Sequence, residues 1–577
     1  MNAPQAPSAP APILLTTLNS SYAHSSFGLR YLLANMGSLK ERTILREFTI
    51  AAHPRTVVEQ ILSYRPALVG FGVYIWNTNE TLKVISILKK VAPEIIIVLG
   101  GPEVSFETTA QALYDKADYV IQGEADFLFR DLCNQVLIRN ETPQTHVSRD
   151  GTSKIIRGPL PEVKDLVLPY DLYSDSDIAH RRIYVEASRG CPYKCEYCLS
   201  SLDKSVRNFD IDLFLNEMQK LIDRGVRQFK FVDRTFNLSV PISTRILEFF
   251  LSHKDKNLFL HFEMIPDRLP DELKCLIRQF PAGSLQFEIG IQTFSRDVQK
   301  NVSRRNDFKK VEENFMFLRN ETGVHTHADL IVGLPGETLE SFGEGFNQLV
   351  NYRPDEIQIG ILKRLKGTPL TKKEIEFSLN YSEYSPFEIL STSTMSFLDI
   401  QNMQKFAKFW DLIANSGEFP RSVTLLKSFG LKYFKNSFFD CFFQFSLFAG
   451  LKTESLHSIS LERVSQILFE FLLTFENEDT KDVARAIIFD YCFSGKRRDL
   501  PSFLKYQNSI YLQLKKDNSS RLSLSPSEKM HLEGSAHFSN HLPDRQRRHS
   551  QSREVDGRDR SSLPLGHPAS NETLGRP

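Results

Sequence analysis

The chain has 577 residues, of which 41% are hydrophobic and 24% are charged, an ordinary composition for a globular protein of several domains. Its 71 Lys and Arg residues nearly balance its 70 Asp and Glu residues, so bulk charge gives no indication of a nucleic-acid or acidic-lipid partner. No apolar run reaches the roughly 18 residues of a membrane span, and seven cysteines fit a reducing compartment better than a disulfide framework. We therefore expect a cytoplasmic protein without a membrane or nucleic-acid partner.

An Ala- and Pro-rich stretch at 1–12 is predicted to be a flexible leader, and the first domain is predicted at 13–145. Five apolar runs alternate there with helix-like stretches: ILLTTL, REFTI, LVGFGVY, IIIVLG and YVIQG. Short β-rich runs separated by amphipathic segments predict a parallel sheet covered by helices on both faces. The fold class expected here is α/β, a doubly wound Rossmann-like (flavodoxin-like) domain.

Ligands of such sheets bind beyond the carboxyl ends of the strands, so the residues that follow each run are candidates for cofactor binding. Two glycines after the fourth run leave the backbone open to a large ring. The candidates are Asn19, Ser20, Trp76, Asn77, Gly100, Gly101, Pro102, Glu103, Gly123 and Glu124. The polar, Pro-containing stretch at 146–180 has little periodicity and is interpreted as a linker.

Residues 188–201, SRGCPYKCEYCLSS, hold three of the cysteines. Cys191, Cys195 and Cys198 lie at spacings that let three thiolates converge on one metal centre. A structural zinc site or an electron-transfer cluster takes four protein ligands, and no fourth Cys or His lies nearby in the sequence. Three ligands on a four-iron cluster leave one iron open to a small molecule. A zinc or redox loop is the alternative interpretation.

This loop, with the aromatic Tyr197 before its last cysteine, resembles the CxxxCxxC loop of the radical S-adenosylmethionine (SAM) superfamily. In that family the open iron binds the amino and carboxylate groups of SAM, and one electron cleaves SAM to a 5'-deoxyadenosyl radical. The resemblance implies a [4Fe-4S] cluster held by the three cysteines, SAM as a cofactor, and a partial TIM-like (β/α)6 barrel. It makes Tyr197 a candidate catalytic residue.

The motifs LGGPE and QGEAD, placed before such a loop, resemble the cobalamin-binding domain of the cobalamin-dependent radical SAM enzymes. The resemblance implies cobalamin as a third cofactor. Cobalamin mutases carry a DxHxxG motif whose His binds cobalt, but here Tyr22 and Phe27 replace its Asp and Gly around His24. We interpret His24 as a loop or helix-start residue, which predicts a cobalt without an imidazole beneath it.

The central domain, predicted at 181–375, again alternates apolar runs and helices: RIYVEAS, QFKFVD, LFLHFEM, SLQFEIGI, HADLIVG and EIQIGIL. Six such strands suit the partial barrel, whose active site lies at the carboxyl ends of the strands. Asp233 and Glu288, near two of these ends, are candidate catalytic residues. The alternative for each is a buried carboxylate paired with a cation such as Arg234 or Arg304.

Two further segments, EIGIQTF and DLIVGLPGE, resemble stretches that line the SAM site in the superfamily. The resemblance places Gln292 near the SAM ribose and Gly333 against the adenine. Asn301, Arg304 and Arg305 are interpreted as a solvated or structural group.

Residues 376–515 are rich in Phe and Leu at helical spacing and predict a helical C-terminal domain of unknown role, and 516–577 are predicted to be a disordered tail. The layout of the chain resembles an uncharacterised bacterial family of cobalamin-binding radical SAM proteins whose C-terminal region has no assigned role. VRNFD and LKRLKGTPL carry this resemblance beside the motifs above.

The prediction is a cobalamin-dependent radical SAM enzyme that abstracts hydrogen from an unactivated carbon of a small molecule and then transfers a methyl group from methylcobalamin. An electron donor such as flavodoxin or ferredoxin is implied. Ring closure or rearrangement is one alternative, and RNA modification with the first domain as a docking module is another. An iron–sulfur electron-transfer or redox-sensing protein is the alternative from a different class.

Overall fold

The computed structural model describes residues 13–143, 145, 153–456, 458–475, 479–494 and 499–522. The predicted leader, the start of the predicted linker at 146–152 and the tail beyond residue 522 lie outside the described residues. Residues 516–522, which we predicted as the start of the tail, are the last turns of helix α18 (Asn508–Leu522). No helix in the described part of the chain combines the length and the apolar character needed to cross a membrane.

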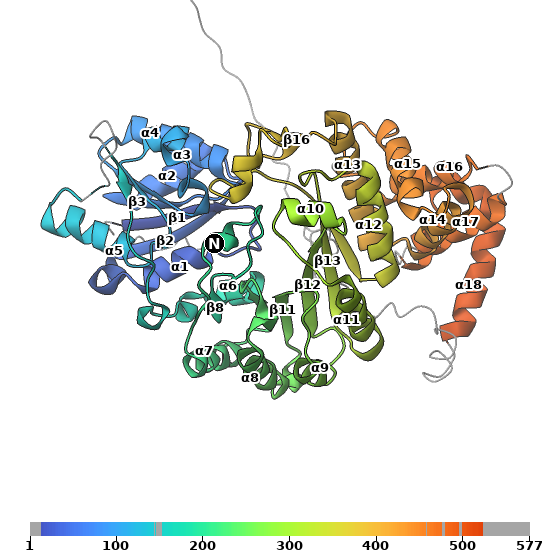
Figure 1. The fold of residues 1–577 in the computed structure, drawn as a ribbon, viewed down its shortest axis with the longest axis horizontal. Helices are drawn as coiled ribbons and strands as arrows, with labels where there is room; N and C mark the ends of the chain where they lie inside the picture. Colours follow the sequence, from blue (N-terminus) through green and yellow to red (C-terminus); the bar gives the residue numbers. More distant parts are fainter. Residues whose placement is uncertain are drawn as a thin grey trace, which may run out of the picture. The chain divides into compact units, whose positions relative to one another are not determined.

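The first sheet is parallel throughout and has the strand order β2-β1-β3-β4-β5-β6 (Figure 1). Its strands are β1 (Ile13–Asn19), β2 (Thr43–Thr49), β3 (Leu68–Gly72), β4 (Ile96–Gly100), β5 (Tyr119–Ile121) and β6 (Ile155–Ile156). This order confirms the predicted doubly wound domain. The edge strand β6 comes from the stretch that we predicted as linker, where two isoleucines were too short a run to indicate a strand.

Both faces of this sheet are buried, which explains why its strands are continuous apolar runs. Leu14 and Val69 pack with α2 (Pro54–Ser63), α3 (Thr78–Val91) and α4 (Ala112–Lys116). The neighbouring Ile13 and Leu15 pack on the opposite face with α1 (Phe27–Ala34) and α5 (Leu128–Cys133). The alternation of the strand side chains therefore anchors one helix layer on each side.

The second sheet is also parallel, in the order β14-β13-β12-β11-β10-β7. Its strands are β7 (Ile183–Val185), β10 (Gln228–Phe231), β11 (Phe259–Met264), β12 (Leu285–Gln292), β13 (His325–Val332) and β14 (Glu356–Ile361). Helices cover its outer face, namely α7 (Ile211–Asp223), α8 (Val240–Leu251), α9 (Asp271–Ile277), α11 (Phe308–Glu321) and α12 (Leu339–Tyr352) (Figure 1). Phe231, Phe262 and Phe287 stack beneath these helices as a buried aromatic row. The partial (β/α)6 barrel is confirmed.

The inner face of this barrel is polar, unlike the aliphatic layers that fill a complete TIM barrel. Its strands place charged side chains there, namely Lys230, His261, Glu263, Glu288, His327 and Asp329. Period-two alternation produces this result, since each of these residues lies one position from a buried apolar neighbour. The barrel interior is therefore suited to polar ligands.

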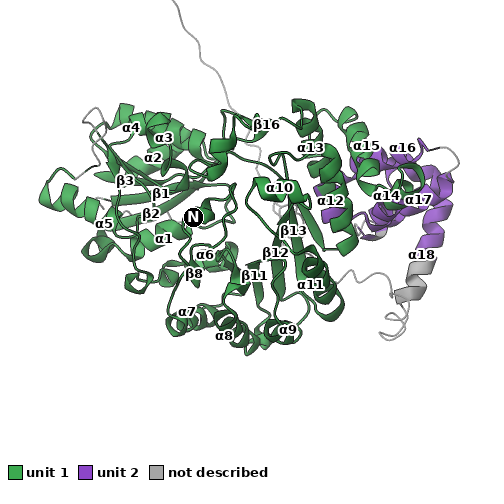
Figure 2. Cartoon of the chain, viewed as in Figure 1, with its two compact units in different colours: residues 1–410, 426–459 green, residues 411–425, 460–577 purple. Residues whose placement is uncertain are grey.

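The C-terminal helices divide between two compact units (Figure 2). Helices α13 (Phe397–Trp410) and α15 (Phe438–Leu451) belong to the unit that holds both sheets, where Phe406 and Phe439 pack against Phe346 of α12. The other unit contains α16 (Leu461–Leu472), α17 (Thr480–Ile488) and α18. Within that unit the buried Asp490 accepts hydrogen bonds from the backbone and hydroxyl of Ser422 in α14 (Pro420–Tyr433), at 2.8 and 2.6 Å. The predicted helical region is thus not a single packed domain.

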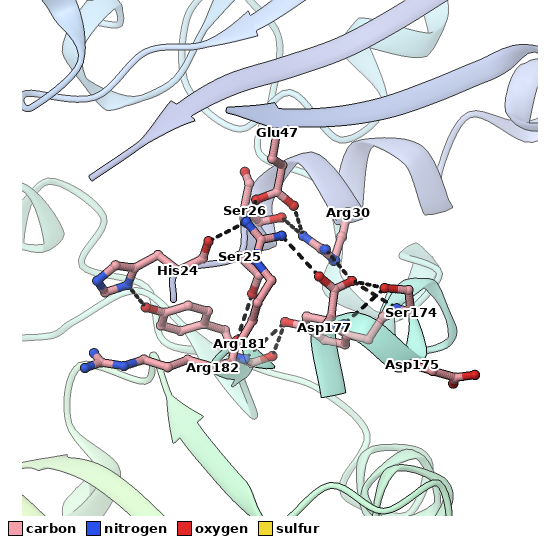
Figure 3. A network of polar contacts seen from close by, with 12 residues as sticks. His24, Ser25, Ser26, Arg30, Glu47, Ser174, Asp175, Asp177, Arg181 and Arg182 are labelled. Carbon is pink, nitrogen blue, oxygen red and sulfur yellow. Dashed lines mark hydrogen bonds and ion pairs between the residues drawn. The ribbon is translucent and has the colours of Figure 1, made fainter. Parts of the chain in front are cut away.

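A buried network of four charges ties the first sheet to the segment that leads into the barrel (Figure 3). Glu47 of β2 contacts Arg30 at 2.6 Å and Arg181 at 3.1 Å. Asp177 of α6 (Asp175–His180) contacts the same two guanidinium groups at 2.9 and 3.1 Å. All four side chains are at most 10% exposed. Each buried charge therefore depends on its partners for compensation.

We expect Glu47→Gln to lower the free energy of unfolding by about 3–5 kcal/mol, because it leaves two buried guanidinium groups with one carboxylate. Urea denaturation followed by circular dichroism measures this loss. Glu80→Gln is the matched control, since the exposed Lys83–Glu80 pair contributes less than about 1 kcal/mol. Equal losses in the two variants would contradict the assigned role of the buried network.

Candidate functional site

A cavity of 470 Å³, which we call the first or glycine-lined cavity, lies at the carboxyl edge of the first sheet. Five of the predicted cofactor-binding residues line it, namely Gly100, Gly101, Pro102, Gly123 and Glu124. Residues of the barrel side, Glu186, Arg189 and Arg234, close the same cavity. A hollow between the edge of the first sheet and the barrel therefore lies beside the LGGPE and QGEAD motifs, where we predict cofactor binding.

Two glycines shape this cavity for different reasons. Gly101 has φ +107°, and a Cβ there would lie 2.5 Å from the carbonyl oxygen of Val73, so the close approach of two backbone segments requires glycine. Gly123 has φ +83°, and a Cβ there would meet no atom within 4 Å. Gly123 thus leaves free space on the cavity side, which a flat macrocycle needs.

The Glu124 carboxylate lines the cavity but is already engaged. It accepts hydrogen bonds from Arg189 at 2.8 Å and from Arg207. Arg189 also contacts Asp126 at 3.1 Å and Glu186 at 2.9 Å, and these surrounding carboxylates raise the pKa of its guanidinium. Glu124 therefore joins the cavity wall to the start of the cysteine loop.

Five other predicted cofactor-binding residues do not line the cavity, namely Asn19, Ser20, Trp76, Asn77 and Glu103. Asn77 is buried and donates to Thr17 Oγ1 and to the carbonyl oxygen of Leu18, both at 3.1 Å. Asn19 donates to Glu47 at 2.6 Å, and Ser20 is exposed. Asn77 and Asn19 thus use their side-chain amides to join neighbouring strands, and a contact of these residues with cobalamin stays a prediction.

Trp76 and Glu103 lie beside the cavity in other roles. Trp76 is 41% exposed and stacks on Tyr74 at a centroid distance of 4.6 Å, and it is Tyr74 that lines the cavity. Glu103 is buried and binds the ammonium group of Lys366, a residue of the chain after β14. Polar residues after a strand need not face the ligand, because they can turn toward neighbouring loops.

His24 is also outside the cavity lining. Its Nδ1 lies 2.5 Å from the hydroxyl oxygen of Tyr184 in β7. Burial, with the nearby cations Arg182, Lys230 and Arg181, lowers the pKa of His24 to about 4. His24 is therefore a neutral contact between the first domain and the barrel.

The cysteine loop lies at the mouth of the barrel, between β8 (Ser188–Arg189) and a short 3-10 turn at Leu199–Leu202. Its three thiols line a second cavity, of 770 Å³, which we call the thiol cavity. No other Cys or His among the described residues lines that cavity. A closed zinc site takes four protein ligands, whereas three thiolates on a four-iron cluster leave one iron open, so a loop with three thiols fits such a cluster.

Arg304 contacts the cysteine loop, although we interpreted it from the sequence as solvated or structural. Its Nη1 lies 3.4 Å from Cys195 Sγ and 3.2 Å from the Tyr197 hydroxyl. The other terminal nitrogen donates to the Gly290 carbonyl oxygen, which fixes the guanidinium in place. Arg304 follows Cys195 by 109 residues, so no local sequence signal could identify this contact.

Three of the remaining candidates line the thiol cavity, namely Tyr197, Glu288 and Gln292. The Glu288 carboxylate contacts His261 at 2.9 Å and Lys230 at 3.5 Å. Gln292 has φ +73°, and its buried Oε1 accepts no hydrogen bond from the described residues. Gln292 therefore offers an acceptor to a ligand.

Asp233 and Gly333 are placed elsewhere. Buried Asp233 accepts hydrogen bonds from the Ala187 backbone at 3.0 Å and the Ser188 hydroxyl at 2.6 Å, and burial raises its pKa to about 7. These bonds fix the segment that leads into the cysteine loop, and a catalytic role for Asp233 stays a prediction. A Cβ on Gly333 would lie 2.7 Å from Ile389 of β16 (Ile389–Ser391), so this glycine permits close packing, and its contact with the adenine stays a prediction.

The sequence also missed other charged residues of the thiol cavity. Arg234, Glu263 and Asp329 line it, with Arg234 3.3 Å from Glu263. Arg234 lines the first cavity as well, so the two cavities share this side chain in their walls. The side chains of Glu263 and Asp329 point into the barrel because of the register of β11 and β13, which the sequence alone did not establish.

A three-thiol loop at the mouth of a parallel partial barrel, beside a doubly wound domain with a glycine-lined edge, defines a radical SAM protein with a cobalamin-binding domain. Family models agree: the radical SAM superfamily model matches residues 185–349 and the B12 binding domain model matches residues 13–132. A model of a protein of unknown function (DUF4080) matches residues 375–538. The chain therefore contains a radical SAM domain, a B12-binding domain and a DUF4080 region, which agrees with the predicted family and its three cofactors.

Individual relatives are distant. The cobalamin-dependent radical SAM methyltransferase TokK of Streptomyces tokunonensis is 25% identical over 343 residues, which are 54% of this chain and 48% of TokK. The chain thus spans about half the length of this curated relative. The structure of the cobalamin-dependent SAM radical enzyme OxsB superimposes with a TM-score of 0.56 at 12% identity, covering 90% of this chain and 82% of OxsB. TsrM from Kitasatospora setae, with cobalamin and a [4Fe-4S] cluster bound, gives a TM-score of 0.53 at 16% identity, covering 63% and 77%.

We expect Gly123→Ala to weaken corrinoid retention, because its methyl group enters the free space of the first cavity. Gly225→Ala is the matched control: Gly225 also has positive φ and open surroundings, but it does not line the cavity, so both variants carry a similar backbone strain of about 1 kcal/mol. Gly101→Ala should instead destabilise the fold, by about 1–3 kcal/mol. Corrin absorbance after gel filtration and urea denaturation measure the two effects. Equal corrinoid loss in the Gly123 and Gly225 variants would contradict this assignment.

Proposed function

We propose that this protein is a cobalamin-dependent radical SAM methyltransferase that transfers a methyl group to an unactivated carbon of a small molecule. The observation that carries the proposal is that the glycine-lined cavity and the thiol cavity are neighbours that share Arg234 in their walls. A methyl donor in one cavity and a radical source in the other would therefore face the same substrate. When bound, the cluster supplies the electron that cleaves SAM, and cobalamin supplies the methyl group.

The side chains of the chain divide this work. Cys191, Cys195 and Cys198 would hold the cluster and leave one iron to SAM. Arg304 places a permanent positive charge against the sulfur of Cys195, which would be a ligand of the cluster. Glu288 and Gln292 line the thiol cavity and would contact the polar part of SAM.

The first domain holds the other cofactor. Gly100, Gly101, Pro102 and Gly123 would lie against the corrin ring. Cys133 is buried and burial raises its thiol pKa to about 12, so this domain offers no reactive thiolate of its own. A corrin site therefore suits this domain better than a second iron–sulfur site.

An electron donor such as flavodoxin or ferredoxin would reduce the cluster. Because such clusters need reducing surroundings, we place the protein in the cytoplasm.

We expect anaerobically reconstituted protein to form 5'-deoxyadenosine from SAM with dithionite, and Cys195→Ala to reduce this product to background. Cys275→Ala is the control, since Cys275 is exposed on α9 and remote from the loop. Liquid chromatography with mass spectrometry measures the nucleoside. With SAM carrying a deuterated methyl group, the bound corrinoid should also acquire that label. A fully loaded cluster that never cleaves SAM would favour the redox-sensing alternative, and cleavage without corrinoid labelling would exclude the methyl transfer.

A further inference from the structure

The segment at 364–374, which we call the bridging segment, contacts two loops. One is the loop after β4, which borders the glycine-lined cavity and which we call the corrin-binding loop, and the other is the cysteine loop. It follows β14 and includes the short 3-10 turn Pro369–Lys373. The radical SAM model ends at residue 349 and the DUF4080 model begins at residue 375, so neither family model covers it. Its contacts give it a role that neither model describes.

One end of the bridging segment contacts the loop that follows β4 through two ion pairs and a packing contact. Lys366 binds the buried Glu103, and Arg364 Nη1 lies 2.7 Å from Glu107 Oε2. Gly367 has φ +83°, and its backbone packs so tightly on the Phe106 ring that a Cβ would clash with it. These contacts fall directly after Gly101 and Pro102, which line the glycine-lined cavity.

The other end grips the cysteine loop. The backbone amide of Leu370 donates to the carbonyl oxygen of Glu196 at 3.1 Å. Lys373 Nζ lies 2.8 Å from Glu196 Oε2 and donates to the Asn301 carbonyl oxygen at 2.7 Å. Glu196 stands between Cys195 and Tyr197, so this end of the segment is one residue from a cluster thiol.

Contacts of its charged side chains restrict the conformation of the bridging segment. Arg364 Nε contacts Glu374 Oε1 at 2.7 Å, which joins its first residue to its last. Lys366 also lies over the Phe387 ring, 4.2 Å from its centroid. The side chains of the Lys366–Glu103 pair are 14% and 3% exposed, and those of the Lys373–Glu196 pair 28% and 14%. Such partly or fully desolvated pairs constrain geometry more than surface pairs do.

We propose that the bridging segment sets the separation of the corrin-binding loop and the cysteine loop, with Lys366 and Lys373 as positioning residues for the step that joins the two cofactors. The identity of the positioned groups rests on the proposed function. The reason is geometric: reacting groups must approach to about 3–3.5 Å, and a misplacement of about 1 Å can cost a hundredfold in rate. Two loops on separate sheets need a common brace to keep that precision.

Hydrogen exchange of the full chain without cofactors tests the brace itself. We expect Lys366→Ala to speed exchange about tenfold in the peptide 101–107 and also in the peptide 191–198, at the far end. Lys373→Ala should affect the same two peptides. Lys372→Ala is the matched control, because Lys372 is exposed and adjacent. Changes confined to the mutated end would overturn the proposal, since the segment would then be two independent contacts.

The loaded protein tests what the brace is for. Lys366→Glu should keep its iron and corrinoid and still form 5'-deoxyadenosine, while transfer of the deuterated methyl group beyond the corrinoid is lost. Pulsed electron paramagnetic resonance should show a broadened distance between cobalt(II) and the reduced cluster. The double variant Lys366→Glu, Glu103→Lys should restore a narrow distance. An unchanged distance in the single variant would overturn the proposal. A wild-type protein that takes up no corrinoid would overturn the proposed function, and the hydrogen-exchange result alone would then decide whether the segment couples the two loops.

Discussion

The arrangement of the two sheets depends on one buried cation, Arg189. Its guanidinium contacts Glu124 and Asp126 of the first domain and Glu186 of the barrel, and it lies over the Tyr31 ring at 4.5 Å. The residues that follow it are Gly190 and Cys191, so the cysteine loop begins at the point where the domains are joined. Buried charge clusters gain little net stability, because desolvation offsets the attraction, but they tolerate few alternative arrangements. The network around Glu47 acts in the same sense at the edge strand.

Much of the fold was predictable from the sequence because both sheets are parallel and buried. Strands such as Leu68–Gly72 are continuous apolar runs, and runs of that kind have few other structures open to them. The cysteine loop was equally accessible, since its three ligands lie within eight residues of one another. What failed was the direction of side chains after strand ends. Asn77 and Glu103 follow strands as expected, yet Asn77 turns toward the end of β1, where it donates to Leu18, and Glu103 turns toward a lysine 263 residues away.

The polar barrel interior separates this protein from folds in which the same strands would make an apolar core. Lys230, His261 and Glu288 form one connected set on three neighbouring strands, in which the Glu288 carboxylate pairs with the Lys230 ammonium group and contacts His261. This compensation lets the strands carry ionised groups without collapse onto aliphatic layers, which leaves volume for SAM and a substrate. Hydrophobic stabilisation is supplied on the outer face instead, by the aromatic row beneath the helices. Helix α12 extends this apolar packing to α13 and α15, so part of the region of unknown function belongs to the barrel scaffold.

The stacked pair of Tyr74 and Trp76 gives the chain an optical property. The chain has two tryptophans, and the other, Trp410, is buried among aromatic rings of α12 and α15. Corrins absorb light in the range where indole emits, so a corrin in the glycine-lined cavity would quench the emission of Trp76 by energy transfer. Trp76 is also the more exposed of the two indoles, and its emission should therefore lie at longer wavelength than that of Trp410. Trp76 is thus an intrinsic fluorophore beside the glycine-lined cavity, and its emission wavelength distinguishes it from Trp410.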